Sequence, residues 1–325
     1  MPRQSAPLVL LALSGFLLLG CSKKEAAPPV AAVEPAPAAE PAPAPALEHT
    51  KAFKIGALDA IALKDGGMDV PNDNKVFGVG QKPEDVAAVL SANNLPTDKL
   101  ALSIQPLLVR SADKVLLFDT GASGNFGPTA GQLPMALTEA GIDILRISDI
   151  FISHVHGDHI GGLVNGRGEL AFPNARIHIS APEWKFLSGL EPEMAKNMGL
   201  NDVPKLVATL QPKIDAFKPG AELIAGVVKA VDIKGHTPGH SGYLIGSGTE
   251  TLLYVGDTLH HQVISVQKPE WTMGYDNDPK VAPKSRAALI AKAAADGQRV
   301  YAVHFPFPGL GKFEKRGDTF AWVAE

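Results

Sequence analysis

The chain has little cysteine and few charged residues. Only one of its 325 residues is cysteine, so no disulfide can form within the chain, and a structural zinc site built from several cysteines is excluded. Thirty Lys and Arg against thirty-four Asp and Glu give a net charge of -4 without any block of like charge, which argues against a nucleic-acid partner. Because 45% of the residues are hydrophobic, the chain can bury a full-sized core, and we expect one folded domain.

A long apolar run is missing as well. Residues 6–19 are apolar and follow Arg3, but they are fewer than the ~20 residues that a membrane-spanning helix needs. We therefore interpret residues 1–20 as an export signal. The run ends in Leu-Leu-Gly-Cys, which resembles the cleavage box of bacterial lipoproteins, and this resemblance implies that Cys21 is lipidated. The serine that follows resembles the pattern of lipoproteins sent to the outer membrane, so we expect a lipid-anchored protein that faces the periplasm.

Residues 21–48 are rich in alanine and proline and contain few large apolar side chains. Such a composition cannot bury enough surface to fold, and proline favours extended geometry. We predict that this segment is a disordered tether and that the folded domain comprises residues 49–325.

Within residues 49–325, short β-rich runs alternate with helical stretches, and no repeat period is present. Strands are predicted at residues 53–63, 101–110, 115–119, 150–153, 176–180, 223–233, 242–245, 251–255 and 300–303. Helices are predicted at residues 83–91, 133–140, 181–187, 283–296 and, with breaks, 193–217. This alternation predicts a layered domain of helices and strands.

Potential metal ligands are most dense in the sequence HVHGDH at residues 154–159, directly after an apolar run. In an extended chain alternate side chains share a face, so His154 and His156 can point at one ion. Gly157 lets the backbone turn, so that Asp158 and His159 face a second position. Imidazole and carboxylate groups suit zinc and other borderline divalent ions. The alternative, a solvated polar loop, is disfavoured because further segments with possible ligands follow in order.

The ordered set resembles the metallo-β-lactamase superfamily. The signature is matched by HVHGDH at 154–159, GHTPGH at 235–240, GD at 256–257 and His304, and DTG at 119–121 resembles the turn that precedes the first motif. The resemblance spans about residues 50–325. It implies an α+β fold, the αββα sandwich, in which two β-sheets are flanked by helices and the site lies at the sheet edges.

The resemblance also implies a ligand set for two divalent ions, which we expect to be Zn²⁺, with Mn, Fe or Co as alternatives. The implied ligands are His154, His156 and His236 for the first ion, Asp158, His159 and His304 for the second, and Asp257 as a bridge. In such a site a hydroxide between the ions attacks the substrate, and Asp158 passes a proton to the leaving group. His240 is expected to make structural hydrogen bonds, whereas His260 and His261 could be supporting residues, substrate contacts or exposed side chains.

Residues 304–311 and 126–129 resemble the methyl parathion hydrolase branch of the superfamily. Members of that branch and their relatives hydrolyse organophosphate triesters, aryl esters and lactones, including acyl-homoserine lactones. An aromatic rim fits these substrates, because phenyl groups and acyl chains need apolar surface. The candidates are Phe126, Trp184, Trp271, Phe305 and Phe307, each of which could equally pack in the core.

The ligand set narrows the activity to hydrolysis of a small ester-like substrate. Redox di-iron members usually have glutamate where His156 stands, and class B β-lactamases generally lack an aspartate at the position of Asp257. Glyoxalase-type thiolesterases share all seven ligands, so this activity remains an alternative. A tethered, non-enzymatic metal-binding module is a further alternative, and a homo-oligomer is compatible with the sequence.

Overall fold

The computed structural model describes residues 48–122 and 126–325. The predicted export signal, Cys21 and nearly all of the predicted tether lie outside the described residues. Within the described ranges, no helix is both long and apolar enough to cross a bilayer.

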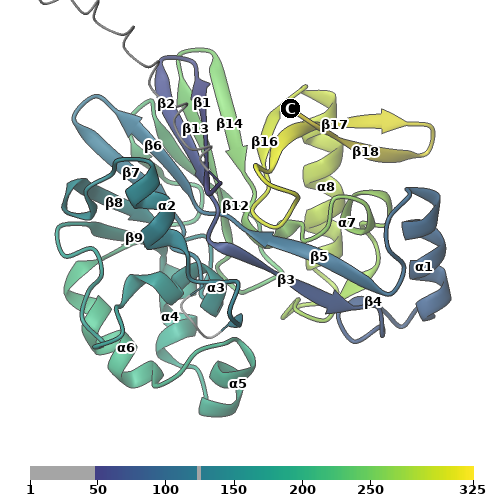
Figure 1. The fold of residues 1–325 in the computed structure, drawn as a ribbon, viewed down its shortest axis with the longest axis horizontal. Coiled ribbons are helices and arrows are strands. Elements are labelled where there is room, and N and C mark those ends of the chain that lie inside the picture. Colours follow the sequence, from purple (N-terminus) through teal and green to yellow (C-terminus); the bar gives the residue numbers. More distant parts are fainter. Residues whose placement is uncertain (1–47, 123–125) are drawn as a thin grey trace, which may run out of the picture. The chain divides into compact units, whose positions relative to one another are not determined.

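Two seven-stranded sheets form the centre of the domain (Figure 1). The first sheet has the order β1-β2-β6-β7-β8-β9-β10. Its strands are β1 (Thr50–Ile55), β2 (Leu58–Leu63), β6 (Leu107–Ser111), β7 (Lys114–Phe118), β8 (Ile147–Phe151), β9 (Arg176–Ser180) and β10 (Ile214–Phe217). Neighbours from β1 to β7 pair antiparallel and those from β7 to β10 pair parallel. Parallel strands are covered on both faces, which explains why β8 and β9 are almost entirely buried.

The second sheet has the order β11-β12-β13-β14-β16-β17-β18. Its strands are β11 (Glu222–Ile224), β12 (Val228–Asp232), β13 (Ser241–Ser247), β14 (Glu250–Tyr254), β16 (Arg299–Tyr301), β17 (Leu310–Arg316) and β18 (Thr319–Ala324). All neighbours in this sheet are antiparallel except β14 and β16. Two small sheets pair β3 (Gly66–Pro71) with β5 (Lys99–Ile104), and β4 (Phe77–Val79) with β15 (Thr272–Met273).

The inner faces of the two large sheets pack against each other through aromatic side chains. Phe118 and Phe151 of the first sheet stack with their ring centroids 4.9 Å apart, and Tyr254 and Tyr301 of the second stack at 5.6 Å. All four are buried in one cluster. Burying each such side chain contributes roughly 1.5–3 kcal/mol, so this interface is a main source of stability for the sandwich.

Helices cover both outer faces. The first sheet is covered by α2 (Leu133–Glu139), α3 (Gly157–Ile160), α4 (Ala181–Ser188), α5 (Pro192–Asn197) and α6 (Val203–Leu210), whose apolar residues join one cluster with the strands. The second is covered by α7 (Ile264–Gln267) and α8 (Ala282–Ala295). The helix α1 (Pro83–Ala92) packs with the small sheets, and short 3-10 turns lie at η2 (Ile144–Arg146), η3 (Gly161–Leu163), η4 (Gln211–Lys213) and η5 (Gly256–Thr258). This layering confirms the predicted αββα sandwich.

Several predicted elements are divided in the structure. The strand predicted at 53–63 is the β1-β2 hairpin, which turns at Gly56 with a φ of 55°, and the strand predicted at 223–233 turns at Gly226 with a φ of 68°. Pro106 separates β5 from β6, because proline has no N–H to donate to a strand neighbour. The helical prediction for 193–217 is wrong at its end, which forms β10 beside β9.

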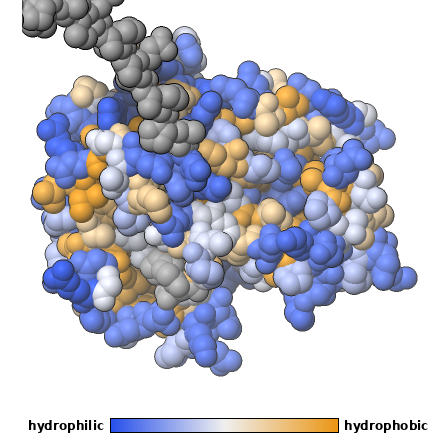
Figure 2. All heavy atoms as spheres, viewed as in Figure 1, coloured by the Kyte–Doolittle hydropathy of each residue, from blue (hydrophilic) through white to orange (hydrophobic). Residues whose placement is uncertain are grey.

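The surface is mostly polar. Figure 2 shows hydrophilic residues over most of the visible face, with hydrophobic residues in small separate groups. Among residues 48–122 and 126–325, the large hydrophobic side chains that are exposed are Met135, Ile144, Leu145, Met194 and Tyr275. Two of them, Met194 on α5 and Tyr275, belong to segments that border the cavity described below.

Candidate metal centre

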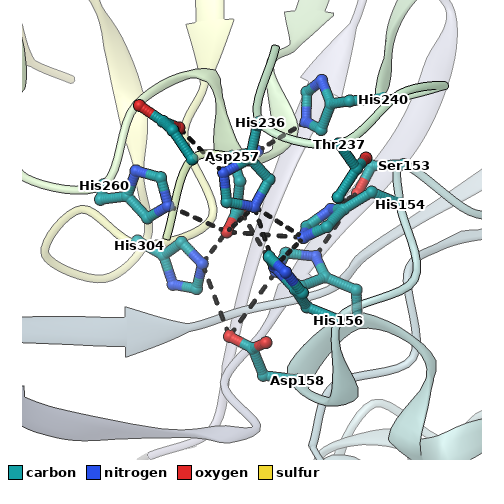
Figure 3. A network of polar contacts seen from close by, with 12 residues as sticks. Ser153, His154, His156, Asp158, His236, Thr237, His240, Asp257, His260 and His304 are labelled. Atoms are coloured by element: carbon teal, nitrogen blue, oxygen red, sulfur yellow. Dashed lines mark hydrogen bonds and ion pairs between the residues drawn. The ribbon is translucent and has the colours of Figure 1, made fainter. Parts of the chain in front are cut away.

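The predicted ligands follow the ends of four strands. HVHGDH follows β8, His236 follows β12, Asp257 follows β14 and His304 follows β16. β12, β14 and β16 belong to one sheet and β8 belongs to the other. The loops that follow these four strands meet at one edge of the sandwich. Figure 3 shows the histidine rings, Asp158 and Asp257 pointing toward one another there.

Gly157 starts α3 and turns the chain, as the sequence predicts. A Cβ at this position would lie 2.6 Å from the carbonyl oxygen of Gly199 and 2.9 Å from the Phe126 ring, so a side chain does not fit. The turn places Asp158 and His159 on the first helical turn, beside the two preceding histidines.

Three imidazole nitrogens converge in the first group of ligands. His236 Nε2 lies 3.1 Å from His154 Nε2 and 2.9 Å from His156 Nδ1, and the last two atoms are 2.9 Å apart. Donor atoms that share one ion at about 2.0–2.2 Å lie roughly 3–3.5 Å from one another. The three rings therefore have the spacing of ligands around a common ion.

Asp257 faces both groups of ligands. Its Oδ2 lies 3.4 Å from His236 Nε2 and 3.6 Å from His154 Nε2. Its Oδ1 lies 3.1 Å from His159 Nε2 and 3.0 Å from His304 Nε2. One carboxylate thus presents one oxygen to each group.

Asp158 completes the second group. Its Oδ2 lies 3.6 Å from both His159 Nε2 and His304 Nε2. The ligand atoms of Asp158, His159 and His304 all lie within 4.8 Å of one another, as do those of the first group with Asp257. His159 Nε2 and Asp257 Oδ1 are buried and, although they lie 3.1 Å apart, form no hydrogen bond with each other or with any other described residue. Buried polar atoms are rarely left unpaired, so these residues fit a pair of bound cations.

In four of the five histidine ligands, the ring nitrogen that points away from the centre is held by a polar contact. His154 Nδ1 lies 3.0 Å from Ser153 Oγ, His159 Nδ1 lies 2.7 Å from Asp119 Oδ2, and His304 Nδ1 lies 2.7 Å from the carbonyl oxygen of Ser103. His236 Nδ1 lies 3.1 Å from Asp276 Oδ1. A ring that donates from its outer nitrogen directs the lone pair of the other nitrogen inward, which is the form that binds metal.

Neighbouring carboxylates separate the protonation of the first group from that of His159. Burial, together with neighbouring histidines, holds the pKa of His154 and of His156 well below its usual range and lowers the pKa of His236 to about 4. These three rings are therefore neutral at pH ~7. Burial also opposes charge on His159, but the Asp257, Asp158 and Asp119 carboxylates raise its pKa well above the usual range. The same carboxylates attract a divalent cation.

His240, His260 and His261, which lie close in sequence to the predicted ligands but are not among them, are all buried. His240 lies 2.9 Å from the carbonyl oxygen of Ile233 through Nδ1 and accepts a hydrogen bond from Asp257 N through Nε2, so both its nitrogens are used by backbone. His261 Nδ1 accepts from the backbone N–H of Ile264 at the start of α7. His260 Nε2 lies 3.2 Å from Asp257 Oδ2, but neither nitrogen of His260 makes a hydrogen bond among the described residues, and its ring borders the cavity.

A cavity of about 330 Å³ opens onto the centre. Its apolar wall is formed by Met68, Leu102, Phe126 and Met198. Asp158, His260 and Tyr275 also border it and supply polar groups.

Of the five aromatic residues predicted to form a rim, only Phe126 borders this cavity. Trp184 packs against the helices over the first sheet, Trp271 packs with α1 and the small sheets, and Phe305 is fully buried beneath α8. Phe307 borders a separate cavity of about 800 Å³ that shares Met68 and Leu102 with the first. The predicted rim is corrected accordingly, because the other rings are used for packing.

The sequence analysis missed the carboxylates that support the centre. Asp119, noted only as part of a turn, accepts hydrogen bonds from Ser153 N, Ser153 Oγ and Tyr254 OH besides its contact with His159. Glu183 is buried and accepts hydrogen bonds from Val155 N, Thr237 Oγ1 and Gly239 N, so it joins the two histidine loops. Asp276 is 40 residues from His236 and has no motif around it that could have identified it.

Known proteins share this arrangement of motifs. The model of the metallo-beta-lactamase superfamily matches residues 102–304, a range that contains all seven predicted ligands. The chain belongs to the metallo-β-lactamase superfamily. It is a metal-dependent hydrolase with a His/Asp metal-binding cluster.

Solved structures of this superfamily align with nearly the whole described domain. AidC, a dizinc quorum-quenching lactonase in complex with a product, is 30% identical with a TM-score of 0.80, over 86% of this chain and 98% of that one. The hydrolase AbOPH is 27% identical with a TM-score of 0.76, over 85% and 97%. Hydroxyacylglutathione hydrolase of Shewanella baltica is 27% identical over 115 residues, which are 35% of each protein. The chain thus spans about a third of the length of that relative.

Proposed function

We propose that this protein hydrolyses lactones and related ester-like bonds with two divalent ions, most simply Zn²⁺, held by the seven side chains. The observation that carries the proposal is the position of Asp257, whose two oxygens face the two groups of ligands at 3.0–3.6 Å. The similarity to a dizinc lactonase over 86% of the chain supports it.

Two ions in such a pair polarise the substrate oxygen and lower the pKa of water toward neutrality. The protein's own residues orient the reaction. Asp158 borders the cavity, so its carboxylate is placed to carry a proton to the leaving oxygen. Burial and the carboxylates of Asp158 and Asp257 raise the pKa of Tyr275, so its hydroxyl keeps its proton and can donate to the substrate.

The cavity supports a substrate with an apolar substituent. Met68, Leu102, Phe126 and Met198 form a wall that an acyl chain or an aryl group can contact without leaving polar atoms unpaired. Aryl esters and organophosphate triesters share this requirement. We place lactones first because the 30% identical relative is a lactonase.

A glyoxalase-type thiolesterase is the second candidate, since hydroxyacylglutathione hydrolase matches 115 residues of the chain. A β-lactamase and a tethered metal-binding module without activity are the remaining alternatives. They differ in turnover, because each enzyme class cleaves a different bond and the module cleaves none.

A hydrolysis panel tests these alternatives. The purified protein, supplied with Zn²⁺, is assayed with an acyl lactone, a phosphotriester, an aryl ester, a β-lactam and a glutathione thioester. We expect the lactone to have the highest kcat/KM. Preference for the thioester would move the assignment to the second candidate, and loaded protein without turnover on any substrate would favour the binding module.

Metal content tests the two-ion proposal separately. Elemental analysis of purified protein should give close to two divalent ions per chain, since each group offers three protein ligands and shares Asp257. A single equivalent that added metal does not raise, with full activity, would refute two-ion catalysis.

We further infer that the protein is exported and anchored by a lipid on Cys21, at the outer membrane facing the periplasm. The Leu-Leu-Gly-Cys sequence and the Ala/Pro-rich segment after it support this inference. Cys21→Ser should release the protein from the membrane fraction with unchanged hydrolysis, because the folded domain begins about 28 residues later. Persistent membrane association of the variant would exclude the lipid anchor.

A further inference from the structure

A buried ion pair lies behind His236. Asp276 directs Oδ1 at His236 Nδ1 at 3.1 Å and accepts a hydrogen bond through Oδ2 from Arg286 Nη2 at 2.7 Å. The Asp276 side chain is 0% exposed and that of Arg286 is 1% exposed. The other nitrogen of His236 faces the predicted first ion, so the three side chains form a chain that ends at the centre.

Arg286 uses its remaining donors on backbone. On α8, its Nε donates to the carbonyl oxygen of Thr258, directly after Asp257, at 2.9 Å. Its Nη1 donates to the carbonyl oxygens of Pro269 and Trp271 at 3.0 and 3.2 Å. One guanidinium therefore joins the loop that carries the bridging aspartate to the segment that leads into Asp276.

The segment after Asp276 is also fastened to the histidine loop. Asn277 N donates to the carbonyl oxygen of His236 at 2.9 Å, and Asp278 N donates to that of Gly235 at 2.8 Å. Ring and backbone of His236 are thus both held by residues 276–278. Tyr275, which borders the cavity, immediately precedes this segment.

We propose that Asp276 and Arg286 are a positioning pair for the first ion: Asp276 fixes the His236 ring with Nε2 toward the ion, and Arg286 fixes Asp276. This inference rests on the proposed two-ion site. Within the first group, His236 differs from His154, whose Nδ1 contacts the neutral hydroxyl of Ser153. A carboxylate on the outer nitrogen makes the ring a stronger ligand and restricts its rotation.

The pair also matches a buried positive charge, that of Arg286, with the negative charge of Asp276. A guanidinium out of water is tolerated only when its donors are matched, and here Asp276 supplies the single carboxylate among its acceptors. Asp276→Asn keeps the shape of the side chain but removes the charge that both His236 and Arg286 contact. Arg286→Lys keeps the charge but cannot reach all four acceptors with one planar group.

The test measures metal binding rather than turnover. Zn²⁺ affinity of the full chain is measured by competition with a chromogenic chelator, and the visible absorption spectrum is recorded after loading with Co²⁺. We expect Asp276→Asn to weaken one of the two Zn²⁺ equivalents by about 10–100-fold, as loss of a carboxylate behind a ligating histidine typically does, and to leave the other unchanged. The Co²⁺ spectrum should change, and Arg286→Lys should weaken the same equivalent by less.

Asp149→Asn is the matched control, because Asp149 also contacts a buried histidine, His178, at 2.9 Å but lies within β8 away from the centre. It should retain both equivalents and the Co²⁺ spectrum even if it melts earlier. If Asp276→Asn does not fold, Arg286→Lys carries the test.

Two results would overturn the inference while the two-ion site stands: unchanged affinities and spectrum in the variants, or an equal loss in the control, which would indicate general destabilisation. Wild-type protein that binds fewer than two Zn²⁺ would instead refute the proposed function, and this inference with it.

Discussion

Two clusters that contain histidine and aspartate differ in how their atoms are paired. In the sheet cluster (Lys114, Asp149, His178 and Asp215), His178 lies 2.9 Å from Asp149 through Nε2 and 3.1 Å from Asp215 through Nδ1, and Lys114 lies 2.7 Å from Asp149. Every contact there joins a carboxylate to a lysine or a histidine. In the metal centre, three ring nitrogens lie 2.9–3.1 Å from one another, and Asp257 Oδ2 comes no closer than 3.4 Å to them.

The difference shows what identifies a metal site before any ion is seen. Burial opposes the charge of Asp149, but His178, Lys114 and Ser148 hold its pKa well below the usual range, so this carboxylate is matched within the sheet cluster without an ion. The first group of the centre instead brings three neutral rings together, with their nitrogens closer to one another than to any carboxylate oxygen of Asp257. A bound cation would supply the positive charge that this arrangement lacks. The number of histidines and aspartates alone does not reveal this need.

The largest effect is expected at the atom that joins the two groups of the centre. Asp257→Ala should reduce lactone or ester hydrolysis by several orders of magnitude and lower bound metal below the wild-type ratio. A bridging carboxylate partly neutralises two close cations, so its loss weakens occupancy and misplaces the reacting water together. Steady-state kinetics with elemental analysis measures both.

His240→Ala is the control for that variant. Its ring contacts only backbone, including Asp257 N at 2.9 Å, so metal content should stay near wild type and activity should fall less. Loss of metal in His240→Ala but not in His236→Ala would require the first group to be redrawn around His240.

A third buried carboxylate sharpens the comparison, because all hydrogen-bond partners of Glu183 are neutral. Burial raises its pKa from 4.5 to about 7 in spite of its three hydrogen bonds. The folded state therefore keeps a proton that the unfolded state releases, and the stability contributed by Glu183 falls as the pH rises through this window. Between the unfolded and folded pKa values, the free energy of unfolding of the wild type should fall by about 3 kcal/mol more than that of Glu183→Gln, at 1.36 kcal/mol per pKa unit.

Urea unfolding of metal-free protein at several pH values measures this difference. A constant offset between the two proteins is expected from the altered hydrogen bonds of glutamine, so only the slope is diagnostic. If the free energies of unfolding of the two proteins change in parallel between mildly acidic and neutral pH, the prediction is contradicted.

The smallest effect is expected in the sheet cluster. Asp149→Asn removes a carboxylate that pairs with His178 and Lys114, and the loss of charged hydrogen bonds should lower the free energy of unfolding by roughly 2 kcal/mol. Metal content and kcat should not change, since the cluster lies within the strands. Reduced metal binding in this variant would show that the two clusters are coupled.

The sequence predicts local features of this protein well. HVHGDH after an apolar strand, the glycine turn at 157 and the order of His236, Asp257 and His304 are all visible in the linear pattern. Most strands were predicted within a few residues, because alternation and apolar runs are local signals. The divisions at Gly56, Pro106 and Gly226 have a local signal in the glycine or proline itself, whereas β10 forms where the helical pattern of the sequence continues.

What the sequence by itself determined is the type of chemistry, because ligand types and their order depend on residues close together in the chain. Only the tertiary structure decided which residues support that chemistry. Asp276 reaches His236 across 40 residues, Arg286 reaches Asp276 from α8, and Trp184, Trp271 and Phe305 turn away from the cavity into the core. The physical reason is that a hydrogen bond or a packed ring depends on positions in space that distant segments set together. The local periodicity of the sequence contains no information on these positions.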